Sequence, residues 1–278
     1  MQSHFVHTHQ IRLHYLDSVG EKTPLLFMHG LTANAHAFDG LVQAGLTDFC
    51  RFISVDLRGR GESDQPAKGY TMKEHAADIL GLMDALGIEN CDLGGHSFGA
   101  LLSLYMAVHH PDRIRRLILV DAAARLHEKT KEMLGPALGR LGQVYESEEF
   151  YMRTIRNAPY LTFWDEAMRS YYRADLRTLP DGTVTPVPTP ENMQAAILEG
   201  SFGEPWAEYI ARIDHESLLI NGADDYMPGA ALLPRAYALE TVEAMKNCRY
   251  VQVPGNHQTM LYGPGATAVV EALRTFLS

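Results

Sequence analysis

A serine inside a short glycine-rich stretch is the first feature of this 278-residue chain that could do chemistry. The stretch GHSFG at positions 95–99 matches the pattern G-x-S-x-G, follows the apolar run from Cys91 and precedes the helix-forming segment ALLSLYMAVHH. A sharp turn from strand to helix presents the serine hydroxyl above the sheet, and flanking glycines leave room for neighbouring backbone. The sequence therefore predicts a nucleophile at Ser97.

The backbone next to this serine could also stabilise a negative charge. Phe98 stands at the N-terminus of the predicted helix, where N–H groups have no partner within the helix. The helix dipole also favours an anion at this end. We therefore predict that the Phe98 N–H binds a developing oxyanion.

A serine hydroxyl is too weak an acid to attack unaided, so a general base must lie within reach and a carboxylate must orient that base. Both groups are expected after Ser97 in the chain. His257, in VPGNHQTMLYG, directly follows the last predicted strand and is the candidate base. His96 is expected to point away from the nucleophile.

Three aspartates are candidates for the carboxylate. Asp224 and Asp225 lie in LLINGADDYMP, just beyond the next-to-last predicted strand, and Asp121 ends the strand LILVD. The carboxyl ends of parallel strands face the ligand site in such sheets. We favour Asp225, and Asp224 and Asp121 remain open alternatives.

These residues need a scaffold of alternating strands and helices. Short apolar runs that do not alternate are typical of strands buried on both faces of a parallel sheet. The strands are expected at 5–8, 11–16, 25–29, 52–56, 91–95, 117–121, 218–221 and 250–253, and the helices at 73–86, 99–109, 231–245 and 265–277. The first two strands alternate more and could form an antiparallel hairpin at the sheet edge. The fold class is therefore α/β, with a mostly parallel eight-stranded sheet.

The alternation of strands and helices stops after the sixth strand. Roughly ninety residues then favour helices and loops, which predicts a helical cap at 123–212 inserted into a core made of 1–122 and 213–278. The cap is dense in aromatic and methionine residues, and such walls suit an apolar or aromatic small-molecule substrate. Its arginines, Arg125 and Arg173 among them, could instead select a carboxylate-bearing substrate.

The chain resembles the α/β-hydrolase family at three motifs. HGLTAN from His29 is similar to the family's His-Gly loop, and this implies that the Leu31 N–H completes the oxyanion hole. DLRGRGESD from Asp56 is similar to a structural loop, which implies that Arg58 and Asp64 pair. The order of Ser97, an acidic loop and His257 looks like the family's catalytic triad.

The acidic loop departs from the family pattern G-x-x-D-x-x-x-P. Counting from Gly222 gives Asp225, whereas counting back from Pro228 gives Asp224. Some members of the family carry the acid after the sixth strand, which keeps Asp121 in consideration. A serine at the elbow, where other members have aspartate, implies acyl transfer and not halide or epoxide chemistry.

The resulting expectation is a serine hydrolase that cleaves a small carboxylic ester, lactone or amide without a metal or other cofactor. One alternative is hydrolysis of a carbon–carbon bond, although HGLTAN lacks the additional glycines associated with that branch of the family. A second is a ligand receptor on the same fold, which would turn over slowly and rearrange its cap.

Composition limits the other classes of function. The formal charge of −10 disfavours nucleic acid as a partner. No apolar run approaches ~18 residues, so no membrane association is expected. Three cysteines without C-x-x-C spacing support neither a disulfide framework nor a zinc site. These features predict a cytoplasmic protein and leave room for a homodimer.

Overall fold

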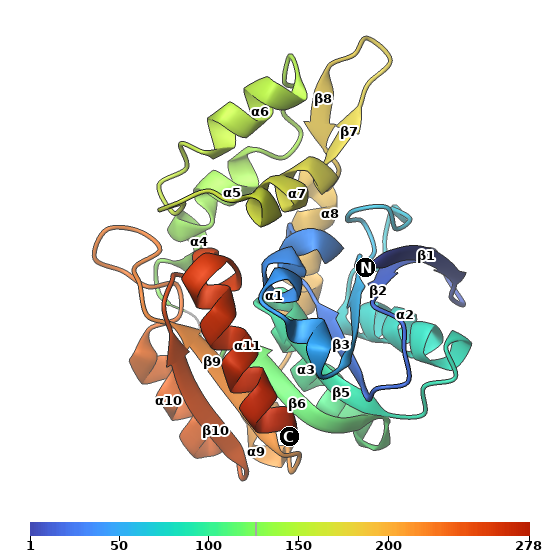
Figure 1. Cartoon of the computed structure of the whole chain (residues 1–278), viewed down its shortest axis with the longest axis vertical. Coiled ribbons are helices and arrows are strands. Elements are labelled where there is room, and N and C mark those ends of the chain that lie inside the picture. Colours follow the sequence, from blue (N-terminus) through green and yellow to red (C-terminus); the bar gives the residue numbers. More distant parts are fainter. Residues whose placement is uncertain (126) are drawn as a thin grey trace.

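An eight-stranded sheet organises the chain in a computed structural model that describes residues 1–125 and 127–278 (Figure 1). The strand order is β1-β2-β4-β3-β5-β6-β9-β10. The strands are β1 (Gln2–His7), β2 (Arg12–Asp17), β3 (Pro24–Met28), β4 (Arg51–Val55), β5 (Cys91–His96), β6 (Ile114–Val120), β9 (Ser217–Gly222) and β10 (Cys248–Val253). The predicted fold class is confirmed.

The first two strands form the expected antiparallel hairpin at one edge of the sheet. They pair in register from Gln2 with Asp17 to His7 with Arg12, and β2 also runs antiparallel to β4. The remaining neighbours, from β4 to β10, are parallel. Their carboxyl ends therefore lie along one edge, where the candidate residues gather.

Helices cover both faces of this sheet, as Figure 1 shows for α1 and α11 on the face toward the viewer. Strand residues divide between two separate buried clusters, one under α2 and α3 and the other under α1 and α11. Leu93 and Leu119, for example, face the first cluster, whereas Phe27 and Ile118 face the second. Because both faces are buried, the strands read as continuous apolar runs. The helices are α1 (Asp39–Gln43), α2 (Met72–Ala85), α3 (Phe98–His109), α10 (Arg235–Ala244) and α11 (Gly263–Leu277).

Residues 130–195 of the segment between β6 and β9 lie beyond the carboxyl edge of the sheet and form the cap, whereas residues 206–212 pack against α3 on the core (Figure 1). The cap is mostly helical, as predicted, but it also holds a short antiparallel hairpin. The first strand of this hairpin precedes the turn-rich stretch 179–192, and the second lies inside it. Leu126, which falls within the predicted cap, is outside the described residues. The elements are α4 (Thr130–Met133), α5 (Gly135–Gly139), α6 (Glu148–Ile155), α7 (Glu166–Ala174), β7 (Leu176–Thr178), β8 (Val184–Pro186), α8 (Pro190–Ala195), η4 (Ala196–Ser201) and α9 (Trp206–Arg212).

A buried arginine fastens the cap to the core. Arg140 donates from Nε to Asp175 at 3.0 Å within the cap, and it also donates from Nη2 to the carbonyl of Thr32 at 2.8 Å. Arg140 and Asp175 are both buried. Because Thr32 follows Leu31, the cap is tied directly to a loop that the sequence places in the candidate site.

Candidate active site

The turn that carries Ser97 has an unfavourable backbone conformation. Ser97 lies between β5 and α3 with φ 55° and ψ −116°, in a region that side-chain-bearing residues rarely adopt. A Cβ on Gly99 would come within 2.0 Å of the Met28 carbonyl oxygen, so only glycine fits beside the neighbouring strand. Strain of this kind persists where the surrounding structure imposes it and is concentrated at functional sites.

Asp121 shares this conformational feature. Its φ is 51°, directly after β6, and only Ser97, Asp121 and the distant Val19 combine a side chain with positive φ in the described parts of the chain. Because β6 lies beside β5 in the sheet, the two strained residues directly follow the ends of neighbouring strands. The fold thus holds an unfavourable backbone at both positions.

The imidazole of His257 is bound by Asp121. His257 Nδ1 lies 2.6 Å from Asp121 Oδ2, and both side chains are buried. The other carboxylate oxygen accepts from the Asn221 side chain and from the Gly222 N–H, each at 2.9 Å. Because the carboxylate is acceptor-only, Nδ1 carries the proton and Nε2 is left free to accept one.

The contacts of Asp121 also keep it ionised. Burial by itself would raise the pKa of this carboxyl, but the hydrogen bond and charge of His257 and the donors at Gly222 and Asn221 outweigh it and lower the pKa. A carboxylate that accepts several hydrogen bonds is stabilised in its charged form. Asp121 is thus suited to hold the imidazole and to balance a positive charge on it.

The structure does not bring Asp225, the favoured candidate, to His257. Asp225 Oδ2 accepts from the Gly229 N–H at 3.0 Å, and Asp224 Oδ2 accepts from the Gly255 N–H at 3.1 Å. Both aspartates are exposed and brace the backbone of their own loop and of the loop before His257. The expectation that Asp225 orients the imidazole is corrected, and Asp121, an open alternative, makes that contact.

The expectation that His96 points away from the nucleophile is wrong, because His96 packs against the base. Its ring centroid lies 4.3 Å from that of His257, and its Nε2–H donates to the His257 carbonyl at 2.8 Å. Burial, together with the nearby His257, lowers the pKa of His96 to about 3. His96 is therefore neutral at physiological pH and helps to fix the backbone that carries His257.

Two backbone segments converge on Ser97. Phe98 is the first residue of α3 with Ser97 as its N-cap, so the Phe98 N–H has no acceptor within the helix. A Cβ on Gly30 would come within 3.5 Å of Ser97 Cβ, which shows that the loop leading to Leu31 passes close to the serine. Leu31, Ser97 and Phe98 all line one cavity. The loop that leads to Leu31 and the first turn of α3 therefore both lie beside the nucleophile.

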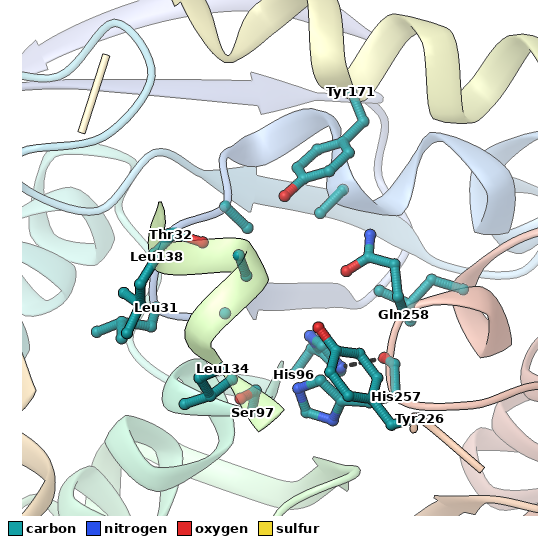
Figure 2. Close-up of a pocket in the computed structure, with 15 residues that line it drawn as sticks. Leu31, Thr32, His96, Ser97, Leu134, Leu138, Tyr171, Tyr226, His257 and Gln258 are labelled. Atoms are coloured by element: carbon teal, nitrogen blue, oxygen red, sulfur yellow. Dashed lines mark hydrogen bonds between the residues drawn. The ribbon is translucent and has the colours of Figure 1, made fainter. Parts of the chain in front are cut away.

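Two neighbouring cavities are lined by both Ser97 and His257. The larger has a volume of about 500 Å³ and is predominantly apolar, with Leu101, Ile197, Leu198, Phe202 and Leu233 in its wall. The smaller has a volume of about 70 Å³. Figure 2 shows the smaller cavity, with Ser97 and His257 toward one end and Tyr171 at the other. The serine and histidine are thus reachable from an apolar chamber and from a more polar one.

Two polar residues of the smaller cavity, Tyr226 and Gln258, were not anticipated from the sequence. Tyr226 directly follows Asp225 and Gln258 directly follows His257, so their position next to candidate residues is the feature of the sequence that could have identified them. Figure 2 shows both side chains beside His257. They supply hydrogen-bonding groups at the polar side of the serine.

The predicted pairing of Arg58 with Asp64 is wrong. Arg58 instead makes a buried bidentate pair with Asp78 of α2, with Nε–Oδ2 at 2.7 Å and Nη2–Oδ1 at 2.8 Å. Asp64 accepts from the Arg12 N–H at 2.8 Å. The motif still ties the loop after β4 to its neighbours, but through a partner on α2.

Comparisons with known proteins agree with this architecture. The model of a family described as alpha/beta hydrolase fold matches residues 23–228. The chain is 28% identical over 224 residues to a 2-hydroxymuconate semialdehyde hydrolase of Pseudomonas sp. strain CF600, covering 77% of this chain and 74% of that protein. It is 34% identical over 122 residues to a 2-(acetamidomethylene)succinate hydrolase of Mesorhizobium japonicum, covering 44% of each.

The first of the curated relatives are matched over less than half of their length, at 46% and 44%. Among solved structures, that of E-2-(acetamidomethylene)succinate hydrolase superposes with a TM-score of 0.86 at 24% identity, covering 99% of this chain and 98% of the other. This similarity establishes the fold. Within the described ranges, no helix is long and apolar enough to cross a membrane.

Proposed function

The chain belongs to the α/β hydrolase fold family, and we propose that within it the protein is a serine hydrolase that cleaves a small carboxylic ester, lactone or amide. The observation that carries the proposal is the bond between Asp121 and His257 beside the strained Ser97. A nucleophile, a base and an orienting carboxylate in this relation are the parts that acyl transfer needs.

In the first half of the reaction, Ser97 Oγ attacks the carbonyl carbon and its proton passes to Nε2 of His257. The N–H groups of Leu31 and Phe98 bind the oxyanion of the tetrahedral intermediate. The bond to the leaving group then breaks, and His257 returns the proton to the leaving oxygen or nitrogen. Asp121 stabilises the imidazolium during both transfers.

The second half uses water in place of the serine. His257 takes a proton from water as the oxygen attacks the acyl carbon, and the same oxyanion site binds the second intermediate. Collapse of this intermediate returns the proton to Ser97 Oγ and releases a carboxylic acid. Apart from the substrate and this water, every group that acts in the two halves belongs to the chain.

The shape of the site favours a substrate with one larger apolar part. A chamber of about 500 Å³ with mainly apolar walls suits a large acyl or alcohol group, and burial of apolar surface there would contribute to binding. The smaller chamber holds Tyr171, Tyr226 and Gln258, which suits a short polar group. The scissile carbonyl would lie between the chambers, at Ser97.

A second candidate is the hydrolysis of a carbon–carbon bond. The supporting observation is the similarity, over 77% of this chain, to a protein named 2-hydroxymuconate semialdehyde hydrolase. A compound of that name has no ester or amide, so its hydrolysis must break a bond between carbons. The same serine, histidine and oxyanion site would serve this reaction, and the products distinguish the two.

The test is proton release in a pH-stat for wild type and Ser97→Ala on esters of increasing acyl length, lactones, amides and a vinylogous diketone. We expect repeated turnover of an ester, lactone or amide by wild type and none by the variant. Turnover of the diketone alone would replace the proposal with the second candidate. Near-stoichiometric release on every compound would instead favour a ligand receptor.

Exposed residues at the mouth of the large chamber allow its role to be tested separately. Leu198 lines the chamber and is 58% exposed, so Leu198→Trp should leave the fold intact while narrowing the entrance. We expect kcat/KM to fall selectively for long acyl chains. Phe150→Trp, an exposed apolar position in the cap outside this chamber, is the matched control. An equal effect on short and long chains would contradict the assignment.

A further inference from the structure

A buried arginine lies directly behind both residues of the proposed oxyanion hole. Arg60 has no exposed surface, and its Nε donates to the carbonyl oxygen of Leu31 at 2.8 Å. Its guanidinium carbon also lies 5.2 Å from the centroid of the Phe98 ring. One side chain therefore contacts the two residues whose N–H groups would bind the oxyanion.

The remaining contacts of Arg60 are all to neutral groups. Nη1 lies 2.6 Å from the carbonyl oxygen of Arg58 and 3.0 Å from Nε2 of His75. Since Nδ1 of His75 donates to the Thr71 carbonyl at 2.8 Å, Nε2 of His75 is the acceptor. Within residues 1–125 and 127–278, Arg60 forms no salt bridge and its Nη2 has no hydrogen-bond partner.

This arrangement differs from that of the other buried arginines. Arg58 is paired with Asp78, and Arg140 with Asp175, each through a buried carboxylate. A buried charge without an opposite charge is costly, and the usual solution is such a pair. Burial lowers the pKa of Arg60 to about 9, which still leaves it cationic at neutral pH. The positive charge is therefore retained beside the site without local neutralisation.

We propose that Arg60 acts through its positive charge, which lies uncompensated behind the oxyanion hole and favours the anionic tetrahedral intermediate over the neutral substrate. The inference rests on the proposed serine hydrolase function. A charge that is already in place when the oxyanion forms needs no reorganisation, and its effect is strong where water is excluded. It should therefore act on kcat more than on KM.

Two substitutions separate the charge from the hydrogen bond. In Arg60→Gln, the side-chain amide nitrogen stands at the chain position of Nε, so the bond to Leu31 can be kept without the charge. In Arg60→Lys, the charge is kept at the end of the side chain without that bond. We expect Arg60→Gln to lower kcat by about ten- to thirtyfold, the effect of one unit charge about 8 to 12 Å from the oxyanion in a medium of effective dielectric near 20. Arg60→Lys should keep kcat within about threefold, with KM within about twofold in both.

A second pair of variants leaves Arg60 in place, in case replacement of Arg60 prevents folding. His75→Glu supplies the missing carboxylate beside Nη1, whereas His75→Gln supplies a neutral acceptor. We expect His75→Glu to lower kcat like Arg60→Gln, and His75→Gln to leave it within about threefold. If both Arg60→Gln and Arg60→Lys lose activity equally and His75→Glu keeps it, the arginine is only a structural tie and the inference is overturned.

Binding of an arylboronic acid extends the test to a readout that needs no substrate. The boron accepts Ser97 Oγ and becomes a tetrahedral anion that resembles the intermediate. We expect its Kd to rise in Arg60→Gln by the same factor as kcat falls, and not in Arg60→Lys. Failure of the proposed function is recognised separately, because wild type would then neither turn over esters nor bind the boronate through Ser97. Equal boronate affinity in wild type and Arg60→Gln would overturn the Arg60 inference alone.

Discussion

Asp121 and His257 are 136 residues apart in the chain, and their carboxylate and imidazole lie 2.6 Å apart in the structure. Asp121→Asn would favour the wrong imidazole tautomer and remove the charge that balances the imidazolium. We expect kcat to fall by about 10³- to 10⁴-fold for the best ester substrate. Asp225→Asn changes an exposed loop position, and its kcat should stay within about threefold of the wild-type value. Comparable losses in the two variants, or a larger loss in Asp225→Asn, would contradict the assignment of Asp121.

The backbone strain at Ser97 leads to a prediction about stability. Ser97→Gly and Ser97→Ala both remove the hydroxyl, but only glycine adopts a φ of 55° without strain. Glycine also adds entropy to the unfolded chain, which offsets part of the relieved strain. With this offset included, we expect Ser97→Gly to be more stable than Ser97→Ala by about 1 kcal/mol. Denaturant unfolding measures this difference.

Ser103, in the interior of α3, provides the matched control. There the order should reverse, with Ser103→Gly less stable than Ser103→Ala by about 1 kcal/mol, because glycine disfavours a helix. If glycine were the less stable substitution at both positions, the turn at Ser97 would not be strained.

Local patterns predicted most of the scaffold and the nucleophile. The apolar runs gave each of the eight sheet strands to within a few residues, and the glycines around Ser97 identified its turn because the backbone geometry there demands them. The choice among Asp121, Asp224 and Asp225 was different in kind. All three follow parallel strands, and only the path of the loop after β9 decides that Asp225 turns back to Gly229.

Long-range contacts were also the source of the other errors. The partner of Arg58 is on α2, and the contact between His96 and His257 joins segments 161 residues apart. Neither of these two contacts can be inferred from the spacing of residues within a motif. The role of Arg60 cannot be predicted from the sequence for the same reason, because the absence of a nearby carboxylate is a property of the packed structure and not of the sequence around it.

Buried neutral histidines should make the protein sensitive to acid. The pKa of His96 is about 3 in the folded chain, below the ordinary value of 6.5, so the unfolded chain binds more protons between these limits. The contribution of His96 is therefore fully present above about pH 6.5 and declines as the pH falls toward 3. We expect His96→Gln to reduce the slope of unfolding free energy against pH in this window by up to about 1.4 kcal/mol per pH unit.

Denaturant titrations of wild type and His96→Gln at several pH values between 6.5 and 4 provide the measurement. His109→Gln is the control, since His109 lies at the end of α3 and is exposed. Parallel curves for wild type and His96→Gln would show that His96 does not remain neutral in the folded state.

The ion pair between Arg140 and Asp175 links cap stability to the site. Arg140→Met would leave Asp175 buried without its partner and would release the Thr32 carbonyl beside Leu31. We expect a loss of about 3 to 5 kcal/mol in unfolding free energy and a lower kcat. Arg173→Met breaks an exposed cap pair with Glu148 and should leave the unfolding free energy nearly unchanged. A small effect of Arg140→Met would show that the cap is held mainly by its apolar contacts.

Mass spectrometry of the quenched reaction tests the central claim most directly. Wild type is mixed with a chromogenic ester, quenched in acid within the burst phase and digested, and the peptide that contains Ser97 is analysed for the acyl group. We predict one acyl group on Ser97, its loss as the reaction proceeds, and neither adduct nor turnover in Ser97→Ala. Turnover without acylation of Ser97, or turnover that persists in Ser97→Ala, would contradict the proposed mechanism.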